Sequence, residues 1–447
     1  MQKKTAGALV GFTAVVLTVI AATAAVTRSG ALKRAEFGPP LTVAEANASN
    51  PTTALAADGS AAYVAWVETK AGASDVFVSQ LVGDTRSAPV RANDVAGDAA
   101  PHEQAPAQVA VGPEGNVYVL WQNNREIAGR RFPASDLRFA RSVDGGKTFE
   151  AAVTVNDDAG ATPSSHTFHD VVVAPDGTVW VSWIDSRVRD GERQRRNPHP
   201  APAEAPKPAP AAAASGHGGH GGHGGMKEDP TLPEPEIRVA KSTDGGKTFG
   251  PSMVVDGGVC PCCRTSLAVG PDGSVYVGWR KHYDGDVRDV VVARLAPGAA
   301  RFGEAVRVYQ DGWVFPGCPH AGPTVAVDAR GRVHVGWYTG KEERQGLWYA
   351  VSEDGGSSYG APVALMTGGF VPPSQVAFVA DGDGVLASWD DRRAADRPLT
   401  LARLENGRVH VLSADAAGRT PAVDARGHAR VVAWHDGQAV RARIASR

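Results

Sequence analysis

The chain has 447 residues, a formal net charge of −2 and charges of both signs throughout. This length allows one large domain or several smaller ones, and the charge balance excludes the basic surface on which nucleic-acid binding depends. Glycine (52 residues) and proline (31 residues) are abundant. Such a composition is typical of many short strands joined by tight turns, and it favours an all-β fold.

The N-terminal segment has the pattern of an export signal. Lys3 and Lys4 precede an apolar run from about Ala6 to Val26, which is typical of a signal peptide and is also long enough to span a bilayer. We therefore expect residues 1–30 to be a signal peptide or an N-terminal membrane anchor. The protein is then secreted, periplasmic or anchored to the outer face of the cytoplasmic membrane, where disulfides can persist.

A strand–turn–strand unit that ends in tryptophan recurs along the rest of the chain. Close copies are Val111–Trp121, Val173–Trp183, Val269–Trp279 and Val327–Trp337, and looser copies end at Trp66, Trp389 and Trp434. Turn sequences such as Pro-Asp-Gly supply the glycine that a tight hairpin needs, and the flanking residues alternate with the period of a strand. Seven copies with matching spacing predict a repeat architecture in which each tryptophan packs between neighbouring units.

A second motif follows three of these units, at Ser142–Phe149, Ser242–Phe249 and Ser352–Tyr359. These segments (SVDGGKTF, STDGGKTF, SEDGGSSY) resemble the Asp box of the sialidase-like (BNR-repeat) β-propeller superfamily. The resemblance covers nearly the whole chain after the export segment, chiefly through repeat motifs. It implies four-stranded blades with the Asp box between the third and fourth strands, on the face away from the family's active site.

The two ends of the repeat region predict how the ring closes. The last copy stops after its third strand at Gln438–Ile444, and Phe37–Val43 before the first copy resembles a fourth strand such as Phe249–Val255. We therefore expect residues 37–447 to form a β-propeller whose N-terminal strand completes the last blade, which removes an exposed sheet edge. The copies favour seven blades, with six as the alternative.

One segment interrupts the pattern between Trp183 and Glu236. It contains a basic run, then a Pro/Ala-rich stretch, then the repeat His217-Gly-Gly-His220-Gly-Gly-His223. Because it lacks apolar periodicity, we expect residues 187–235 to be a disordered insertion between the second and third strands of the third blade.

Counting back from each tryptophan brings the cysteines together. His166, Cys262 and His320 each lie seventeen residues before the tryptophan of their blade, and Cys260 and Cys318 each lie nineteen before theirs. These positions fall in the connections that enter three consecutive blades, at one mouth of the central channel. The predicted ligand set is therefore Cys260, Cys262, Cys263, Cys318, His320, His166 and His169.

Thiolates with imidazoles suit Cu(I) or Zn(II), and Met226 beside the His-Gly-Gly repeat favours copper over zinc. The alternative is structural, because four cysteines in an exported protein form two disulfides by default. Four further residues lie near the same mouth and either bind an anion or are solvated rim residues: Arg264, Arg280, His282 and Tyr283.

Three functions remain open at this stage. The first is an exported propeller that binds a metal ion, in metal handling or redox chemistry. The second is an exo-α-sialidase-type glycoside hydrolase, which the resemblance implies; the family's Arg-Ile-Pro motif is absent, and no catalytic residue is carried over, although Arg264, Arg280 and Arg393 supply positive charge and Tyr283 or Tyr338 a hydroxyl. The third is a disulfide-stapled scaffold whose partner is a glycan or another exported protein.

Overall fold

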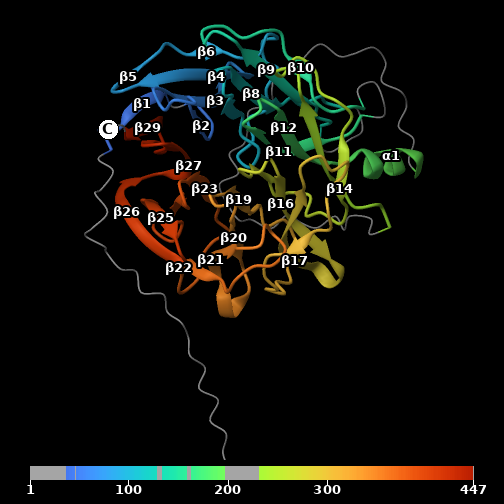
Figure 1. The fold of residues 1–447 in the computed structure, drawn as a ribbon. Helices are drawn as coiled ribbons and strands as arrows, with labels where there is room; N and C mark the ends of the chain where they lie inside the picture. The colour runs from blue at the N-terminus through green and yellow to red at the C-terminus, as the bar shows by residue number, and fades with distance from the viewer. Residues whose placement is uncertain (1–36, 46, 128–132, 159–162, 197–230, 446–447) are drawn as a thin grey trace, which may run out of the picture.

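The computed structural model describes residues 37–45, 47–127, 133–158, 163–196 and 231–445. Within these residues the chain forms seven antiparallel sheets arranged in a ring (Figure 1). The predicted all-β propeller with seven blades is confirmed, and the alternative of six blades is wrong. The predicted signal segment, residues 1–30, lies outside the described residues, and no helix within them is long and apolar enough to cross a membrane.

The strands follow one another around the ring. The first three blades contain β2 (Thr52–Leu55), β3 (Ala62–Lys70), β4 (Ala73–Val82), β5 (Thr85–Arg86) and β6 (Val90–Arg91); β7 (Gln108–Val111), β8 (Val117–Gln122), β9 (Leu137–Ser142) and β10 (Val153–Thr154); and β11 (His166–Val173), β12 (Val179–Asp185), β13 (Glu236–Ser242) and β14 (Met253–Asp256). The fourth and fifth blades contain β15 (Ser266–Val269), β16 (Val275–Tyr283), β17 (Val287–Leu295) and β18 (Val306–Arg307); and β19 (Thr324–Val327), β20 (Val333–Thr339), β21 (Gly346–Ser352) and β22 (Val363–Thr367). The last two blades contain β23 (Val376–Asp381), β24 (Gly384–Asp390), β25 (Pro398–Glu405) and β26 (Arg408–Ala417); and β27 (Arg419–Arg426), β28 (Ala429–His435), β29 (Val440–Ala445) and β1 (Leu41–Ala44). Short 3-10 turns lie at Asp284–Asp286 (η1) and Glu342–Arg344 (η2).

The tryptophan of each repeat lies on the second strand of its blade and is buried. The seven indoles are at most 4% exposed, and they pack in the apolar clusters that join neighbouring blades. The repeat therefore encodes the contact between blades as well as the blade itself, which is why its period predicts the ring.

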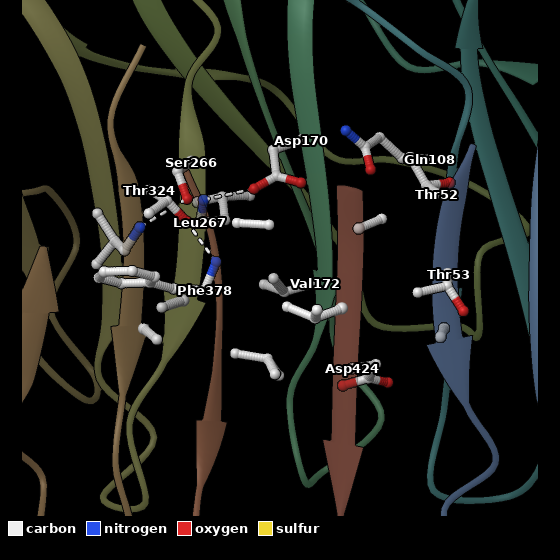
Figure 2. Close-up of a pocket in the computed structure, with 18 of the residues that line it drawn as sticks. Thr52, Thr53, Gln108, Asp170, Val172, Ser266, Leu267, Thr324, Phe378 and Asp424 are labelled. Carbon is white, nitrogen blue, oxygen red and sulfur yellow. Dashed lines mark hydrogen bonds between the residues drawn. The ribbon is translucent and has the colours of Figure 1, made fainter. Parts of the chain in front are cut away.

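Side chains on the innermost strands fasten each blade to the next (Figure 2). The Asp170 carboxylate of β11 accepts a hydrogen bond from the Leu267 amide of β15 at 2.7 Å. The Ser266 hydroxyl accepts from the Val325 amide at 3.0 Å, and the Thr324 hydroxyl from the Phe378 amide at 3.3 Å. Because these strands lie in different sheets, the bonds satisfy inner-strand amides that no ladder reaches.

The N-terminal strand closes the ring as predicted. Strand β1 pairs antiparallel with β29 and so becomes the outer strand of the last blade. Its Val43 is fully buried in the cluster shared by the last and first blades.

The start of the insertion differs from its prediction of disorder. Helix α1 (Arg187–Arg196) follows β12 directly, between the second and third strands of the third blade. It begins with the hydrogen bond from the Asp190 amide to the Ser186 carbonyl, and Arg193 and Arg196 form ion pairs one turn apart with Asp190 and Glu192. Such local pairs stabilise a helix that has no apolar stripe. Residues 197–230 of the insertion lie outside the described residues.

Candidate metal centre

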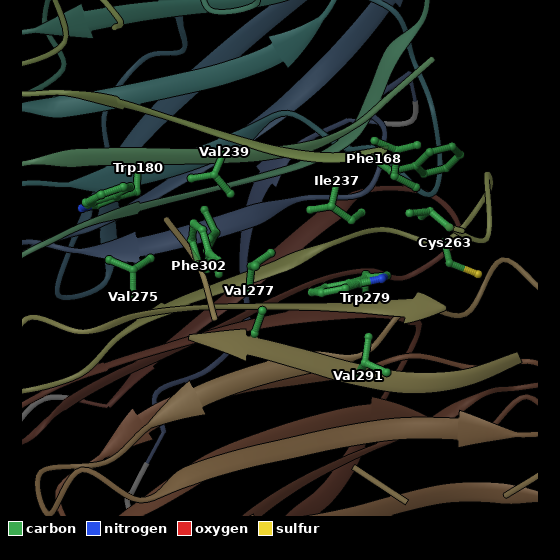
Figure 3. Packing of buried hydrophobic residues seen from close by; sticks show 14 of the residues in the cluster. Phe168, Trp180, Ile237, Val239, Cys263, Val275, Val277, Trp279, Val291 and Phe302 are labelled. Carbon is green, nitrogen blue, oxygen red and sulfur yellow. The ribbon is translucent and has the colours of Figure 1, made fainter. Parts of the chain in front are cut away.

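The four cysteines lie in two successive connections between blades. Cys260, Cys262 and Cys263 lie between β14 and β15, and Cys318 lies between β18 and β19. The first connection is held at its start, because the Cys260 amide donates to the Arg280 carbonyl at the end of β16. The three cysteines of this connection belong to the core cluster between the third and fourth blades, which also contains Trp279. Figure 3 shows Cys263 and Trp279 within this cluster.

These three thiols form a compact group. The Cys260 sulfur lies 3.1 Å from that of Cys263 and 3.7 Å from that of Cys262. Each of the three residues is at most 5% exposed, and all four cysteines are thiols in the structure. Three buried sulfur atoms within 4.8 Å of one another are close enough to bind one metal ion.

A second group joins the two connections. The Cys262 sulfur also lies within 4.8 Å of the Cys318 sulfur and of a His320 ring nitrogen. Cys318 and His320 are exposed, whereas Pro319 and Ala321 beside them are buried. Cys262 and His320, which lie equally far before their tryptophans, are thus close together, and Cys318 joins them from two residues before His320.

A glycine allows the two connections to approach each other. A Cβ atom on Gly322 would lie 2.2 Å from the Arg264 carbonyl oxygen, so no other residue fits there without moving the backbone. His320 has a φ of 52°, an uncommon value for a residue with a side chain. The close approach of these two backbones brings the Cys318 segment to the buried thiols.

Two buried guanidinium groups lie beside the thiols. Arg280, which is 1% exposed, donates only to the backbone carbonyls of Ala321, Arg288 and Tyr338. Arg288, which is 6% exposed, donates from Nε to the Phe315 carbonyl, and its buried Nη1 has no hydrogen-bond partner among the described residues. Within the described residues Arg280 forms no ion pair, and Arg288 reaches only the half-exposed Asp286, at 3.8 Å. A guanidinium stays charged in a protein, so this site has an excess of buried positive charge.

The thiols respond to that charge. Burial acts to raise the pKa of Cys260, but hydrogen bonds from the Cys262 and Cys263 thiols and the charges of Arg288 and Arg280 outweigh it and hold the pKa well below its usual value. Burial raises the pKa of both Cys262 and Cys263. The charges of Arg288 and Arg280 therefore favour the thiolate form at Cys260 over that at its two neighbours.

The two histidines predicted from the third blade do not join these ligand groups. His166 lies at the start of β11 with its ring between Asp158, Asp185 and the Ser135 carbonyl. His169 is buried and its Nε2 lies 3.1 Å from the Pro106 carbonyl. Burial lowers the pKa of His169 to about 3, so its ring is neutral. Equal spacing in the sequence sets the height of a residue along the channel but not the direction of its side chain. The His166 ring contacts the Ser135 carbonyl and the His169 ring the Pro106 carbonyl, both from segments next to the second blade.

The four residues predicted at the rim have separate roles. Arg280 is buried under Trp313 and bound to carbonyls, so it is no rim residue. The His282 ring lies against Asp286 and Glu234, and the Tyr283 hydroxyl accepts from Arg307. Arg264 alone of the four lines the central channel.

The central channel is a cavity of about 430 Å³ bounded by the inner strands of all seven blades. Its polar lining includes Arg264, whose buried Nε has no hydrogen-bond partner among the described residues, together with Arg392 and Glu103. Asp170 also lines it, and burial raises the pKa of this carboxyl to about 6. Sequence reasoning missed Arg288, Arg392 and Asp170, because no motif marks them and only the ring brings them to the site.

The Asp-box turns lie where the resemblance placed them. Each connects the third and fourth strands of its blade, and in the first of them Asp144 accepts hydrogen bonds from the Lys147 and Thr148 amides at 3.0 Å. They therefore lie on the opposite face from the thiols.

No family model and no curated protein matches the sequence. Among solved structures, a PL25 ulvan lyase superposes with a TM-score of 0.53 at 12% identity, covering 90% of this chain and 95% of the lyase. The Hadza microbial sialidase Hz136 gives 0.48 at 11% identity, covering 84% of this chain and 74% of that one. A protein of unknown function from Dyadobacter fermentans gives 0.46 at 14% identity, covering 91% and 99%. At these identities the likeness is one of fold. The fold is that of a seven-bladed β-propeller.

The three arginines considered from the resemblance to sialidases do not come together in this fold. Of the three arginines considered from the sequence, only Arg264 lines the channel. Arg280 is bound to carbonyls, and Arg393 pairs with Asp391 and the Thr367 carbonyl. The Tyr338 hydroxyl is buried and donates to the Val371 carbonyl.

Proposed function

We propose that this sialidase-like propeller binds copper as Cu(I) through the thiols between its third and fifth blades, as an exported metal-handling protein. The observation that carries the proposal is that three buried thiols lie beside two buried guanidinium groups. Among the described residues Arg280 has no carboxylate partner, and Arg288 reaches only the half-exposed Asp286. One Cu(I) held by three thiolates carries a net charge of −2. This charge would balance Arg280 and Arg288.

The same charge argument weighs against the disulfide alternative. A disulfide is neutral, so a bridge between Cys260 and Cys263 would leave Arg280 buried with no ion-pair partner among the described residues, and Arg288 with only the half-exposed Asp286, which is costly. Zn(II) with three thiolates would carry only −1, whereas soft thiolates suit Cu(I). Copper therefore accounts for the buried charge better than zinc or a disulfide does.

Metal analysis of the reduced full chain tests the proposal. We expect the protein to take up Cu(I) in competition with a Cu(I) chelator, with near-ultraviolet absorption from sulfur-to-copper charge transfer. The variant Cys260→Ser/Cys262→Ser/Cys263→Ser should lose both signals. A control with His217, His220 and His223 changed to alanine should keep them, because it retains every thiol.

Folding of each variant is checked by circular dichroism, and free thiols are counted in the unreduced protein. Absence of stoichiometric Cu(I) from the fully reduced wild type would exclude the proposal. Finding no free thiols before reduction, with no metal uptake after it, would support the disulfide-stapled scaffold instead.

A second candidate, a glycan-active enzyme, rests on the channel. The channel is lined by Arg264, Arg392 and Asp170. The buried Nε of Arg264 has no hydrogen-bond partner among the described residues, and burial raises the pKa of Asp170 to about 6. These groups suit an acidic ligand and a proton transfer. Turnover of a fluorogenic sialoside or of an acidic polysaccharide by the metal-free protein, abolished in Asp170→Asn, would support this function.

A further inference from the structure

The two ligand groups share one sulfur atom, that of Cys262. Cys260 and Cys263 complete the first group, and Cys318 and His320 complete the second. We infer that the site holds two Cu(I) ions bridged by the Cys262 thiolate, an inner ion and an outer ion. This inference rests on the proposed function.

Distance separates the two positions. Two ligands of one ion, each about 2.3 Å from it, lie at most about 4.6 Å apart. Within each group all ligand atoms lie within 4.8 Å of one another, but neither Cys260 nor Cys263 joins a group with Cys318 or His320. One ion therefore cannot reach all five residues without a rearrangement, whereas two ions that share Cys262 can.

Charge allows the second ion to be added. The inner ion with the thiolates of Cys260, Cys262 and Cys263 carries −2, which Arg280 and Arg288 balance. A second Cu(I) that brings the Cys318 thiolate and the neutral ring of His320 adds no net charge. The buried guanidinium groups therefore suit the cluster equally well with one ion or with two.

Burial makes the two positions unequal in access. The inner ligands are at most 5% exposed, while Cys318 and His320 of the outer group are exposed. A small chelator or a metal-carrying partner can thus reach the outer ion directly, and the inner ion only after the outer segment has moved. The outer position is the place of exchange and the inner position the place of retention.

The experiment counts ions and measures their release, with the three histidines of the His-Gly-Gly repeat changed to alanine in every sample. The reduced protein is loaded with Cu(I) and mixed rapidly with excess Cu(I) chelator. We expect two ions per chain, one released at least tenfold faster than the other. Cys318→Ser and His320→Ala should each bind one ion and lose the fast phase. Cys263→Ser should keep the fast phase and lose the slow one.

His282→Ala is the matched control, because this ring lies near the site but outside both groups, and it should behave as the parent does. Binding of one ion by the parent, unchanged in Cys318→Ser, would overturn the two-ion site and leave the proposed function standing. Binding of one ion that is released faster in both Cys263→Ser and Cys318→Ser would also overturn it. That result would indicate a single ion that moves between the inner and the outer position. Failure to bind any Cu(I) would overturn both.

Discussion

His166 shows how one ring is fixed by its surroundings. Its Nδ1 lies 2.6 Å from the Ser135 carbonyl, and its Nε2 lies 3.1 Å from Asp158 and 3.5 Å from Asp185. Both ring nitrogens face acceptors, so the ring is favoured as the cation. Burial opposes the charge, but the hydrogen bond to Asp158 and the two carboxylates outweigh it and raise the pKa of His166. Arg187 pairs with the same carboxylates and limits the effect.

Replacement of His166 by glutamine should cost about 2 kcal/mol at pH 6, because Asp158 and Asp185 lose one of the cations that face them. A raised pKa means that this stability is fully present below pH 6.5 and is lost as the pH rises through the folded value. The free energy of unfolding of the wild type should therefore decrease as the pH rises above 6.5, and that of His166→Gln should not show this decrease. Urea unfolding at several pH values measures it, with the exposed His428→Gln as control. Equal slopes in His166→Gln and wild type would show that the ring is neutral.

The sequence predicted which residues lie together where their height along the channel, counted from the tryptophan of each blade, was sufficient to bring them into contact. Cys262 and His320 occupy equivalent positions of adjacent blades, Cys318 lies two residues before His320, and the structure brings the three together. His166 has the same spacing as Cys262 and His320, but its ring lies against Asp158 and Asp185. The counter-charges Arg280 and Arg288 depend on the β16–β17 pairing and on the neighbouring loop, which no local motif encodes.

Each Asp-box turn contacts the preceding blade as well as connecting two strands of its own blade. A Cβ atom on the second glycine of each box would lie 3.2–3.3 Å from a tyrosine ring of the preceding blade: Gly146 at Tyr63, Gly246 at Tyr118 and Gly356 at Tyr276. These glycines also have φ between 82° and 89°. The motif therefore joins blades as well as strands.

Gly246→Ala tests this contact, since its Cβ would also lie 2.6 Å from the Phe139 ring. The matched control is Gly115→Ala, which has a nearly identical φ of 81° and nothing within 4 Å. Both changes should cost about 1 kcal/mol for the left-handed backbone. Gly246→Ala should lose about 1–3 kcal/mol more through overpacking. Urea unfolding compares them, and equal losses would show that the turn does not press on the preceding blade.

At the scale of the whole molecule, the number of blades and their closure were predictable because the repeat carries both the hairpin and the buried tryptophan between blades. Helix α1 was not predictable, since Arg187–Arg196 has no apolar face and depends on ion pairs and on the Ser186 carbonyl. The channel lining was equally hidden, because it assembles single polar residues from seven distant segments.

Closure of the ring depends on one short strand, and Val43→Asp tests it. Val43 is fully buried between the last and first blades, so a carboxylate there should lower the free energy of unfolding by about 3 kcal/mol. In this variant the amides of β29 should exchange their hydrogens faster than in the wild type, while the exchange rates in the other blades change less. Val82→Asp is the control, because Val82 is 50% exposed. Unchanged exchange in β29 would mean that closure does not depend on β1.

The pairing of β1 with β29 also sets an order of events during synthesis. Thr42 and Arg441, which contact each other across this pair, are 399 residues apart in the chain. The ring therefore cannot close until β29 has been synthesised, and until then the nascent protein holds an open edge and an unfinished blade. A contact between segments so distant in the chain forms slowly, so we expect closure to follow the folding of the separate blades.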